Sequence, residues 1–283
     1  MTDGDSTDDG FMSAEELRRF CEYFYSRTGI SYGDGKKLYI ERRVAERMHS
    51  IGAKNFATYM RLLRTHPYEV EQLINAFTVN ETYYYREDAH LRCLSDALLP
   101  DIIRFRAPGE LIRIWSIPCS TGEEPYSIAI WLLENWRLVD AYNIEILASD
   151  IDTRVLEQAA DGIYGTRALS RLPTNVLTQY FTNIQPGKWQ VIRDLRESVK
   201  FTQANLIDGS SMRAHGTFDI IFCRNVLIYF DDASRHVASV NLYNCLNPKG
   251  YICLGHSESM ARISDRFTSR RFTDGLVHQR PEL

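Results

Sequence analysis

Two adjacent carboxylates, Glu123 and Glu124, follow the turn-forming residues Ser120, Thr121 and Gly122. An apolar run precedes this turn and apolar residues at helical spacing follow it, which predicts a buried strand, a turn and a helix. Backbone N–H groups at the start of such a helix can approach a ligand. The pyrophosphate fingerprint G-x-G-x-x-G is absent, and the two carboxylates disfavour a dianion. This chemistry suits a ligand with a cationic group and ribose hydroxyls.

S-adenosylmethionine carries an ammonium group, a sulfonium and ribose hydroxyls, so it is a candidate ligand for the turn. The alternative is an ordinary strand–helix turn in another α/β enzyme, and the turn alone leaves both interpretations open. A dinucleotide oxidoreductase is a poorer alternative, because the glycines of its fingerprint are missing.

Polar residues or a glycine also follow the ends of four predicted strands. Open α/β sheets bind ligands at the carboxyl ends of their strands, so we expect these residues to converge. They are Gly122, Asp150, Asn205 and Asn225. An acidic residue after the second strand of such folds holds ribose hydroxyls, a role open to Asp150 or Asp152. The competing role is to cap the helix predicted from Thr153 to Asp161, and either aspartate suits it.

Alternating strands and helices predict a doubly wound α/β fold from residue 111 onward. The preceding segment is predicted to be all-helical, and Ser13 with Glu16 forms a capping box at its start. We expect a disordered acidic tail (1–12), a helical domain (13–79), a linker with a connecting helix from about Ala89 to Arg106 (80–110), and an α/β domain (111–283) with a small β insertion at about 163–198.

The second predicted helix, about Lys36 to Ile51, carries a basic stripe beside its apolar seam. We define the basic stripe as Lys36, Arg43 and Arg47. Charged residues usually mark a solvated helix face. The alternative is a docking surface for an acidic helical partner, which the position beside the seam favours.

Composition limits the function further. The chain has 283 residues, 44% of them hydrophobic, and a net charge of −4, so nucleic acid is not an expected partner. No apolar run approaches the roughly 18 residues of a membrane span, and the acidic N-terminus does not read as a signal peptide. The six cysteines form no C-x-x-C pair, so we expect neither a metal site nor disulfides, and a cytoplasmic location.

Four motifs closely resemble the bacterial chemotaxis receptor methyltransferases. They are N-E-T-Y-Y-Y-R-E at 80–87, S-T-G-E-E-P-Y-S at 120–127, A-S-D-I-D at 148–152 and F-C-R-N-V-L-I-Y-F at 222–230. The resemblance covers about residues 13–280. It implies an S-adenosylmethionine-dependent protein-glutamate O-methyltransferase, with a class I methyltransferase-type sheet, a small inserted β-subdomain and an all-α N-terminal domain.

The resemblance also implies roles for individual residues. It places Asn80, Thr82 and Arg86 at cofactor and active-site positions, and one of Glu123 and Glu124 at the cofactor. Together with the glycine turn, the expected cofactor-binding residues are Asn80, Thr82, Arg86, Gly122, Glu123, Glu124, Asp150, Asn205, Leu206, Arg224 and Asn225. It also implies that the basic stripe binds the methylated helices of a chemoreceptor's cytoplasmic domain.

One segment departs from the family pattern. Some members grip a peptide at the receptor's C-terminus through an Arg-Gly-rich loop of the insertion. Here the corresponding segment, 182–190, reads T-N-I-Q-P-G-K-W-Q and lacks that pattern. Tethering through such a peptide is therefore left open.

The expected reaction moves a methyl group from sulfur to a carboxylate oxygen, with S-adenosylhomocysteine as product. A glutamate side chain is already ionised at neutral pH, so no general base is needed. Arg86 and Tyr229 are the catalytic candidates, Arg86 to orient a carboxylate and Tyr229 to wall the site. For Tyr229, as for Tyr83, Tyr84 and Tyr85, the alternative role is packing.

The open alternatives are a related methyltransferase acting on another substrate, and a non-catalytic module that binds the cofactor and docks on a receptor. The intact residues at the strand ends argue against loss of catalysis. We expect a monomer that needs no metal and does not insert into a membrane.

Overall fold

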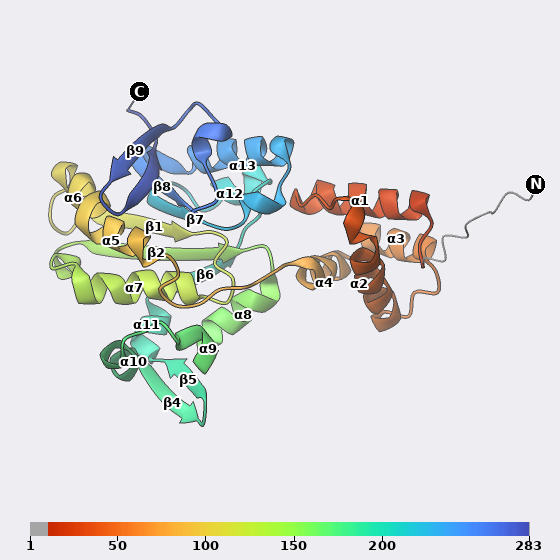
Figure 1. The fold of residues 1–283 in the computed structure, drawn as a ribbon, viewed down its shortest axis with the longest axis horizontal. Coiled ribbons are helices and arrows are strands. Elements are labelled where there is room, and N and C mark those ends of the chain that lie inside the picture. The colour runs from red at the N-terminus through yellow and green to blue at the C-terminus, as the bar shows by residue number, and fades with distance from the viewer. Residues whose placement is uncertain (1–10, 283) are drawn as a thin grey trace, which may run out of the picture. The chain divides into compact units, whose positions relative to one another are not determined.

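The computed structural model describes residues 11–282, and the chain divides into two compact units, 1–78 and 79–283. The described part of the first unit is helical, as predicted (Figure 1). Its elements are α1 (Ala14–Thr28), the 3₁₀ turn η1 (Asp34–Lys36), α2 (Lys37–Ser50), α3 (Phe56–Thr65) and α4 (Pro67–Phe77).

The helix α1 begins at the predicted capping box. The Ser13 hydroxyl accepts the N–H of Glu16, and the Glu16 carboxylate accepts the N–H of Ser13. The helix buries aromatic side chains, and the ring of Phe24 lies 4.9 Å from that of Phe77 on α4. Aromatic packing between the first and last helices therefore closes this unit.

The acidic tail was predicted to span residues 1–12. Residues 1–10 lie outside the described part of the chain. For Met12 the prediction is wrong, because its side chain is buried and its N–H donates to the Glu41 carboxylate at 2.9 Å. A single apolar side chain among acidic residues gains enough from burial to order its end of the segment.

A mixed sheet of seven strands organises the described part of the second unit, in the order β6-β2-β1-β7-β8-β10-β9. Neighbours from β6 to β8 pair in parallel, and β10 pairs antiparallel with both β8 and β9. The strands are β1 (Leu111–Ser116), β2 (Asn143–Asp150), β6 (Val199–Gln203), β7 (Phe218–Cys223), β8 (Leu246–Leu254), β9 (Thr268–Phe272) and β10 (Gly275–Gln279). The predicted doubly wound sheet is confirmed. Its strand order reverses between β1 and β7, the position where such sheets bind ligands.

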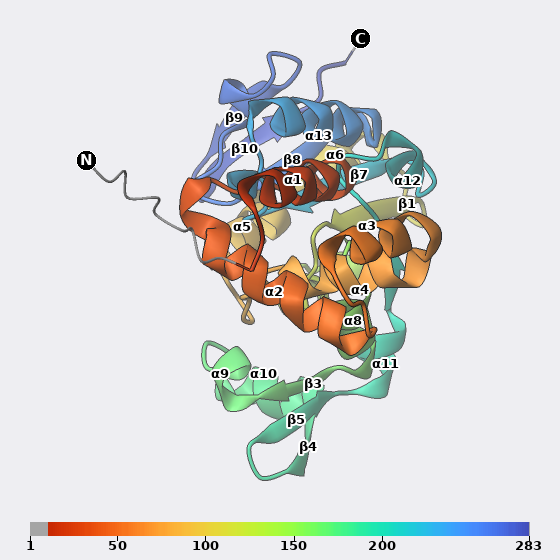
Figure 2. The same cartoon turned by 90° about the vertical axis from the view of Figure 1, so that its right-hand side faces the viewer.

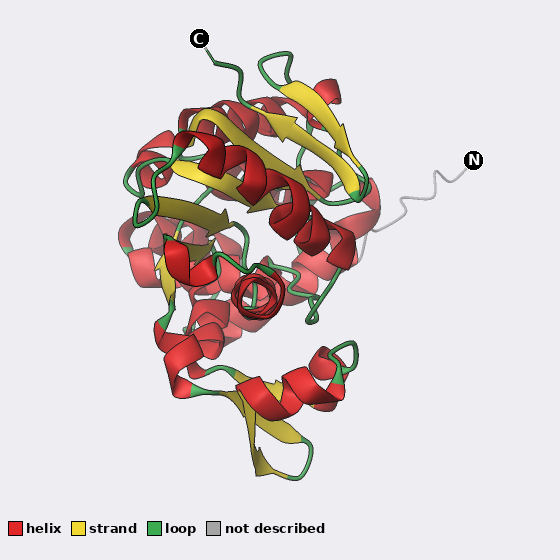
Figure 3. Ribbon diagram, turned by 90° about the vertical axis from the view of Figure 1, so that its left-hand side faces the viewer, coloured by secondary structure: helices red, strands yellow, loops and turns green. Residues whose placement is uncertain are grey.

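Helices cover both faces of this sheet (Figures 1 and 3). In Figure 1, α7 and α8 lie on one side and α12 and α13 on the other. Their bounds are α7 (Glu123–Asn135), α8 (Thr153–Asp161), α12 (Gly209–Arg213) and α13 (Asp232–Asn244). Burial on both faces explains why β7 is buried along its whole length and reads as a continuous apolar run.

The connecting helix was predicted as one element but changes its winding. It consists of α5 (Asp88–Cys93), the π-helical segment η2 (Leu94–Leu98), α6 (Leu99–Ile102) and the 3₁₀ segment η3 (Ile103–Phe105). Pro100 has no N–H to donate to the preceding turn, which accounts for the change beside it.

The insertion between α8 and β6 forms its own antiparallel sheet, in the order β3-β5-β4 (Figures 1 and 2). Its elements are β3 (Ile163–Gly165), α9 (Thr166–Leu169), α10 (Thr174–Tyr180), β4 (Phe181–Gln185), β5 (Lys188–Val191) and α11 (Arg193–Glu197). The hairpin turns at Pro186 and Gly187, and Gly187 has a φ of 74°. Across residues 11–282, no helix combines the length and the apolar character that crossing a membrane requires.

Candidate active site

The turn after β1 lies tightly against two neighbouring elements. Gly122 has a φ of 93°, which disfavours any other residue. A Cβ there would lie only 2.9 Å from both the Cβ of Ala159 on α8 and the hydroxyl of Tyr164 on β3. That hydroxyl donates to the carbonyl of Thr121 at 2.7 Å. Glycine is therefore required at position 122 both for its conformation and for space.

Asp150 ends β2 and is buried directly beside this turn. Its carboxylate accepts the N–H of Ser120 at 2.8 Å and that of Asp152 at 3.0 Å. Burial raises the pKa of Asp150 to about 6, although these hydrogen bonds act in the opposite direction. The carboxylate thus joins the ends of β1 and β2, the position where such folds hold ribose hydroxyls.

The helix-capping role belongs to Asp152. Its carboxylate accepts the N–H groups of Arg154 and Val155 in the first turn of α8. It also accepts the Asn80 amide at 2.9 Å, and the Asn80 carbonyl accepts the Ser120 hydroxyl at 3.3 Å. Asn80, far away in sequence, therefore lies beside the ends of both β1 and β2.

Arg224 follows β7 and is almost completely buried. Its guanidinium lies 2.8 Å from the Glu124 carboxylate and 3.1 Å from that of Glu87, and donates to the Arg86 carbonyl at 2.8 Å. Burial alone would lower the pKa of Arg224, but the carboxylates of Glu124 and Glu87 hold it above its ordinary value. The same pairing lowers the pKa of Glu87 against the opposing effect of burial. Arg224 thus connects the segment 80–87 to the turn after β1.

The adjacent glutamates have different partners. Glu124 accepts the Ser116 hydroxyl at 2.8 Å in addition to Arg224. Glu123 is buried, and burial raises the pKa of its carboxyl, which accepts the Thr121 hydroxyl at 2.6 Å.

The ends of β6 and β7 carry three further predicted cofactor residues. The side chain of Asn205 accepts the N–H of Ile207, and the Leu206 carbonyl accepts the amide of Asn241 at 2.8 Å. Asn225 has a left-handed backbone with a φ of 59°. These contacts shape the turns that carry Asn205, Leu206 and Asn225 at the same edge of the sheet.

The tyrosines of segment 80–87 have different roles. Tyr84 and Tyr85 are buried, Tyr84 in edge contact with Tyr164, so the packing alternative is correct for both. Tyr83 is half-buried, and Thr82 precedes it in the same segment.

The two catalytic candidates are accessible to solvent. The Arg86 guanidinium lies 5.8 Å from the Tyr83 ring centroid and donates to the Glu81 carbonyl at 2.8 Å. Tyr229 is 39% exposed at the end of the 3₁₀ segment η5 (Leu227–Tyr229). Both side chains belong to segments that adjoin Arg224, since Arg86 bonds to it and η5 follows it along the chain.

Glu258 was not predicted from the sequence. Its carboxylate accepts four backbone N–H groups, from Asn225, Val226, Leu227 and Gly255. The available signal was a carboxylate shortly after an apolar strand, which is β8 in the structure, and it resembles the signal that identified Asp150.

The donor set at this edge fits S-adenosylmethionine. The carboxylates outnumber the single buried guanidinium of Arg224, which is itself neutralised by two of them. These carboxylates are Glu87, Glu123, Glu124, Asp150 and Asp152. Such a surface repels a pyrophosphate and attracts a cationic ligand.

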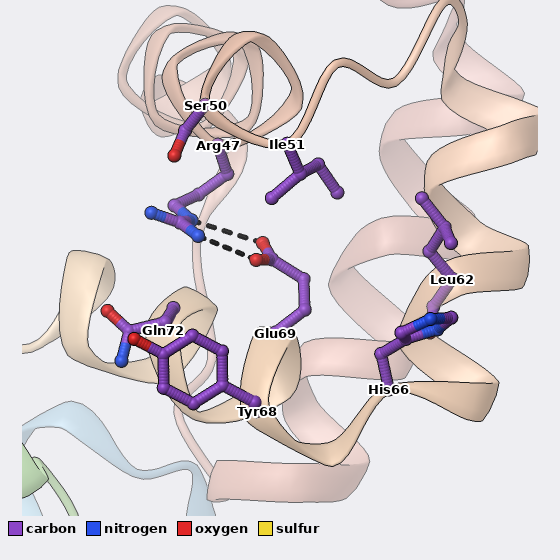
Figure 4. A pocket seen from close by; sticks show the side chains of 8 residues that line it. All are labelled: Arg47, Ser50, Ile51, Leu62, His66, Tyr68, Glu69 and Gln72. Atoms are coloured by element: carbon purple, nitrogen blue, oxygen red, sulfur yellow. Dashed lines mark hydrogen bonds and ion pairs between the residues drawn. The ribbon is translucent and has the colours of Figure 1, made fainter.

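The basic stripe is not uniformly solvated. Lys36 is exposed, and the Arg43 side chain is 34% exposed. Arg47 instead forms two hydrogen bonds, of 3.1 and 2.6 Å, to the buried carboxylate of Glu69 (Figure 4). That carboxylate also accepts the Tyr59 hydroxyl at 2.9 Å. The guanidinium of Arg47 therefore has a structural partner within its own domain, beside a hollow of about 540 Å³.

The strand order, the glycine turn after β1 and the carboxylate that ends β2 define a class I, S-adenosylmethionine-dependent methyltransferase. Residues 15–78 match the family described as "CheR methyltransferase, all-alpha domain", and residues 80–276 match "CheR methyltransferase, SAM binding domain". This chain belongs to the CheR methyltransferase family.

Relatives with assigned names are similar to this chain over most of its length. "Chemotaxis protein methyltransferase 2" of Vibrio cholerae is 47% identical over 265 residues, which cover 93% of this chain and 92% of the relative. "Chemotaxis protein methyltransferase" of Escherichia coli is 36% identical, over 92% of this chain and 89% of the relative. The protein of the same name from Borreliella burgdorferi is 35% identical, over 88% and 89%.

Proposed function

We propose that this methyltransferase converts glutamate side chains on the cytoplasmic helices of a methyl-accepting chemoreceptor into methyl esters, for adaptation in chemotaxis-type signalling. S-adenosylhomocysteine is the second product. One observation carries the proposal. The segment 80–87, where Arg86 lies, is joined through Arg224 and Asp152 to the cofactor-binding edge of a family methyltransferase fold.

When bound, S-adenosylmethionine supplies a methyl group on a positively charged sulfur. The ionised carboxylate of Asp150 accepts hydrogen bonds from the ribose hydroxyls. The turns after β6 and β7, with Asn205, Leu206 and Asn225, contact the remainder of the nucleoside. Asn80, Thr82 and the glutamate pair complete the site.

The accepting glutamate needs no activation by a base, because its ordinary pKa near 4.3 leaves it ionised at neutral pH. The protein contributes by aligning the attacking oxygen with the methyl group and by excluding water. Arg86 orients a carboxylate, either that of the substrate or that of the cofactor. It does not face the sulfonium, since two positive charges would repel each other. Tyr229 contributes to the wall of the site.

The helical domain supplies the docking surface. Lys36, directly before α2, and Arg43 on α2 present positive charge, which complements the acidic methylation helices of a receptor. Arg47 supports this surface through its pair with Glu69. We further propose that the protein works in the cytoplasm as a monomer, without nucleic acid.

The test uses receptor-containing membranes and cofactor labelled in its methyl group. Carboxyl methyl esters hydrolyse in base and release labelled methanol, whereas methyl groups on nitrogen do not. Volatile label after base treatment is the expected outcome. Label that stays on protein after base would assign the activity to another acceptor group, and cofactor binding without transfer would support the non-catalytic alternative.

A further inference from the structure

We propose that Glu258 is a positioning residue of this methyltransferase. Its one carboxylate joins the ends of β7 and β8 and sets where Arg224, Asn225 and η5 lie. The inference rests on the proposed cofactor contact of Asn225. It concerns the cofactor side of the site and is independent of which protein accepts the methyl group.

Both carboxylate oxygens of Glu258 accept hydrogen bonds from backbone N–H groups. Oε2 accepts the N–H of Asn225 at 2.7 Å and that of Gly255 at 2.9 Å. Oε1 accepts the N–H of Val226 at 3.0 Å and that of Leu227 at 2.8 Å. Hydrogen bonds to an ionised acceptor are roughly twice as strong as neutral ones. Both oxygens are thus used, each by two donors.

These backbone groups need a side-chain acceptor. Asn225 is left-handed, and Leu227 begins a 3₁₀ segment. N–H groups at the start of a helical segment have no carbonyl partner within it. The carboxylate of Glu258, which lies beyond β8, satisfies three consecutive N–H groups of this loop. It thereby anchors the backbone of the loop at three consecutive residues.

Gly255 gives independent support for a close approach. A Cβ at this position would lie 2.7 Å from the side-chain Nδ2 of Asn225, 2.8 Å from Oε2 of Glu258 and 3.1 Å from the backbone nitrogen of Asn225. Gly255 is not among the residues with positive φ, so the limited space, and not the backbone conformation, favours glycine there. The end of β8 is therefore shaped to let the carboxylate reach the loop.

The loop that Glu258 holds is also connected to residues near the proposed methyl-transfer site. Arg224 directly precedes this loop and bonds to Glu124 and to the Arg86 carbonyl. Tyr229 ends η5, whose first N–H binds Glu258. Loss of the carboxylate should therefore displace residues that bind the cofactor and residues that border the methyl-transfer site.

The substitution Glu258→Gln is the sharpest test, because an amide nitrogen cannot accept the two N–H groups that one carboxylate oxygen now accepts. The matched control is Asp219→Asn at the amino end of β7. Asp219 is also buried and accepts the Arg113 N–H, the Arg106 guanidinium and the Asn247 amide. It differs in lying at the edge opposite to the active site.

Calorimetry with S-adenosylhomocysteine gives Kd, and initial rates with S-adenosylmethionine give KM and kcat. We expect Glu258→Gln to raise Kd and KM at least about tenfold, the effect of losing strong hydrogen bonds. Asp219→Asn should lower the denaturation midpoint but leave Kd and KM within about twofold of wild type, because its donors lie away from the site. Gly255→Ala, which keeps the carboxylate but crowds both it and the Asn225 side chain that it positions, should also raise Kd.

Wild-type values of Kd and KM in Glu258→Gln would overturn the proposal. An equal rise in Asp219→Asn would do the same, since it would reveal a general loss of stability. If Glu258→Gln does not fold, Gly255→Ala decides, and an unchanged Kd there rejects the proposal. A wild-type protein that binds S-adenosylhomocysteine but leaves receptor membranes unlabelled would refute the proposed function and leave these comparisons valid.

Discussion

The guanidinium of Arg224 lies 2.8 Å from the carboxylate of Glu124, and the two side chains are only 4% and 14% exposed. Nη1 of Arg224 faces Glu124, and Nη2 faces the carboxylate of Glu87, which is 19% exposed. Removing one member of such a group leaves charges buried without compensation, which is far more costly than losing an exposed pair.

Arg224→Met should therefore lower the free energy of unfolding by about 3–5 kcal/mol, because Glu124 and Glu87 lose their shared cation. Urea denaturation followed by circular dichroism measures this change. Adding Glu124→Gln should recover part of the loss. Arg18→Met is the control, since Arg18 pairs with Glu15 and Glu22 in solvent and should not affect stability measurably. Wild-type stability in Arg224→Met would contradict the expectation.

Arg86→Ala should abolish most methyl transfer while the protein stays folded, because the side chain is half-buried and lies over Tyr83 without entering the core. Turnover of labelled cofactor is the measurement. Arg171→Ala offers a matched control, since the Arg171 guanidinium lies 5.0 Å from the same ring and is exposed. Near-normal turnover in Arg86→Ala would remove Arg86 from the site.

Asp150 makes stability and cofactor binding depend on pH in opposite directions. Its pKa is about 6 in the folded protein and near 3.9 when unfolded, so the folded state binds the proton more tightly. Its contribution to stability is fully present below about pH 4 and is lost as pH rises through 6. A shift of two pKa units corresponds to roughly 3 kcal/mol. Asp150→Asn should therefore become more stable relative to wild type between pH 4 and 7, as denaturant titrations at each pH can show.

The ionised form of Asp150 is the one that accepts ribose hydroxyls. Calorimetry should therefore show S-adenosylhomocysteine binding more tightly to wild type as pH rises from 5 to 7, and Asp150→Asn should weaken binding and flatten this dependence. An unchanged Kd in Asp150→Asn would leave the aspartate a purely structural role.

Arg47 and Lys36 should behave differently although the basic stripe contains both. Arg47→Ala leaves the buried Glu69 carboxylate without its cation and should destabilise the helical domain by about 3 kcal/mol or more. Lys36→Ala should leave stability unchanged and weaken binding to a receptor fragment, measured by calorimetry at low salt. Equal stability losses in both variants would refute this division of roles.

Short-range interactions made much of the fold predictable. Ser13 and Glu16 lie three residues apart, and their capping box could be predicted because both partners lie within one helical turn. The bounds of α8 were predicted correctly, and the structure shows a capping aspartate at its start and a glycine just after its end. The parallel sheet followed from alternating strand and helix patterns, and the sheet in turn predicted that Gly122, Asp150, Asn205 and Asn225 share one edge.

Only the tertiary structure decided what depends on contacts between distant residues. From the sequence, Arg47 was interpreted as part of an exposed basic stripe. In the folded chain it pairs with Glu69, which lies 22 residues away in the sequence. Glu258 gave little signal because the N–H groups that it binds lie 31 to 33 residues earlier in the loop after β7. A residue's type and its near neighbours determine helix, strand and turn. The partner of a buried charge depends on which distant segments pack together, and that arrangement exists only in the folded chain.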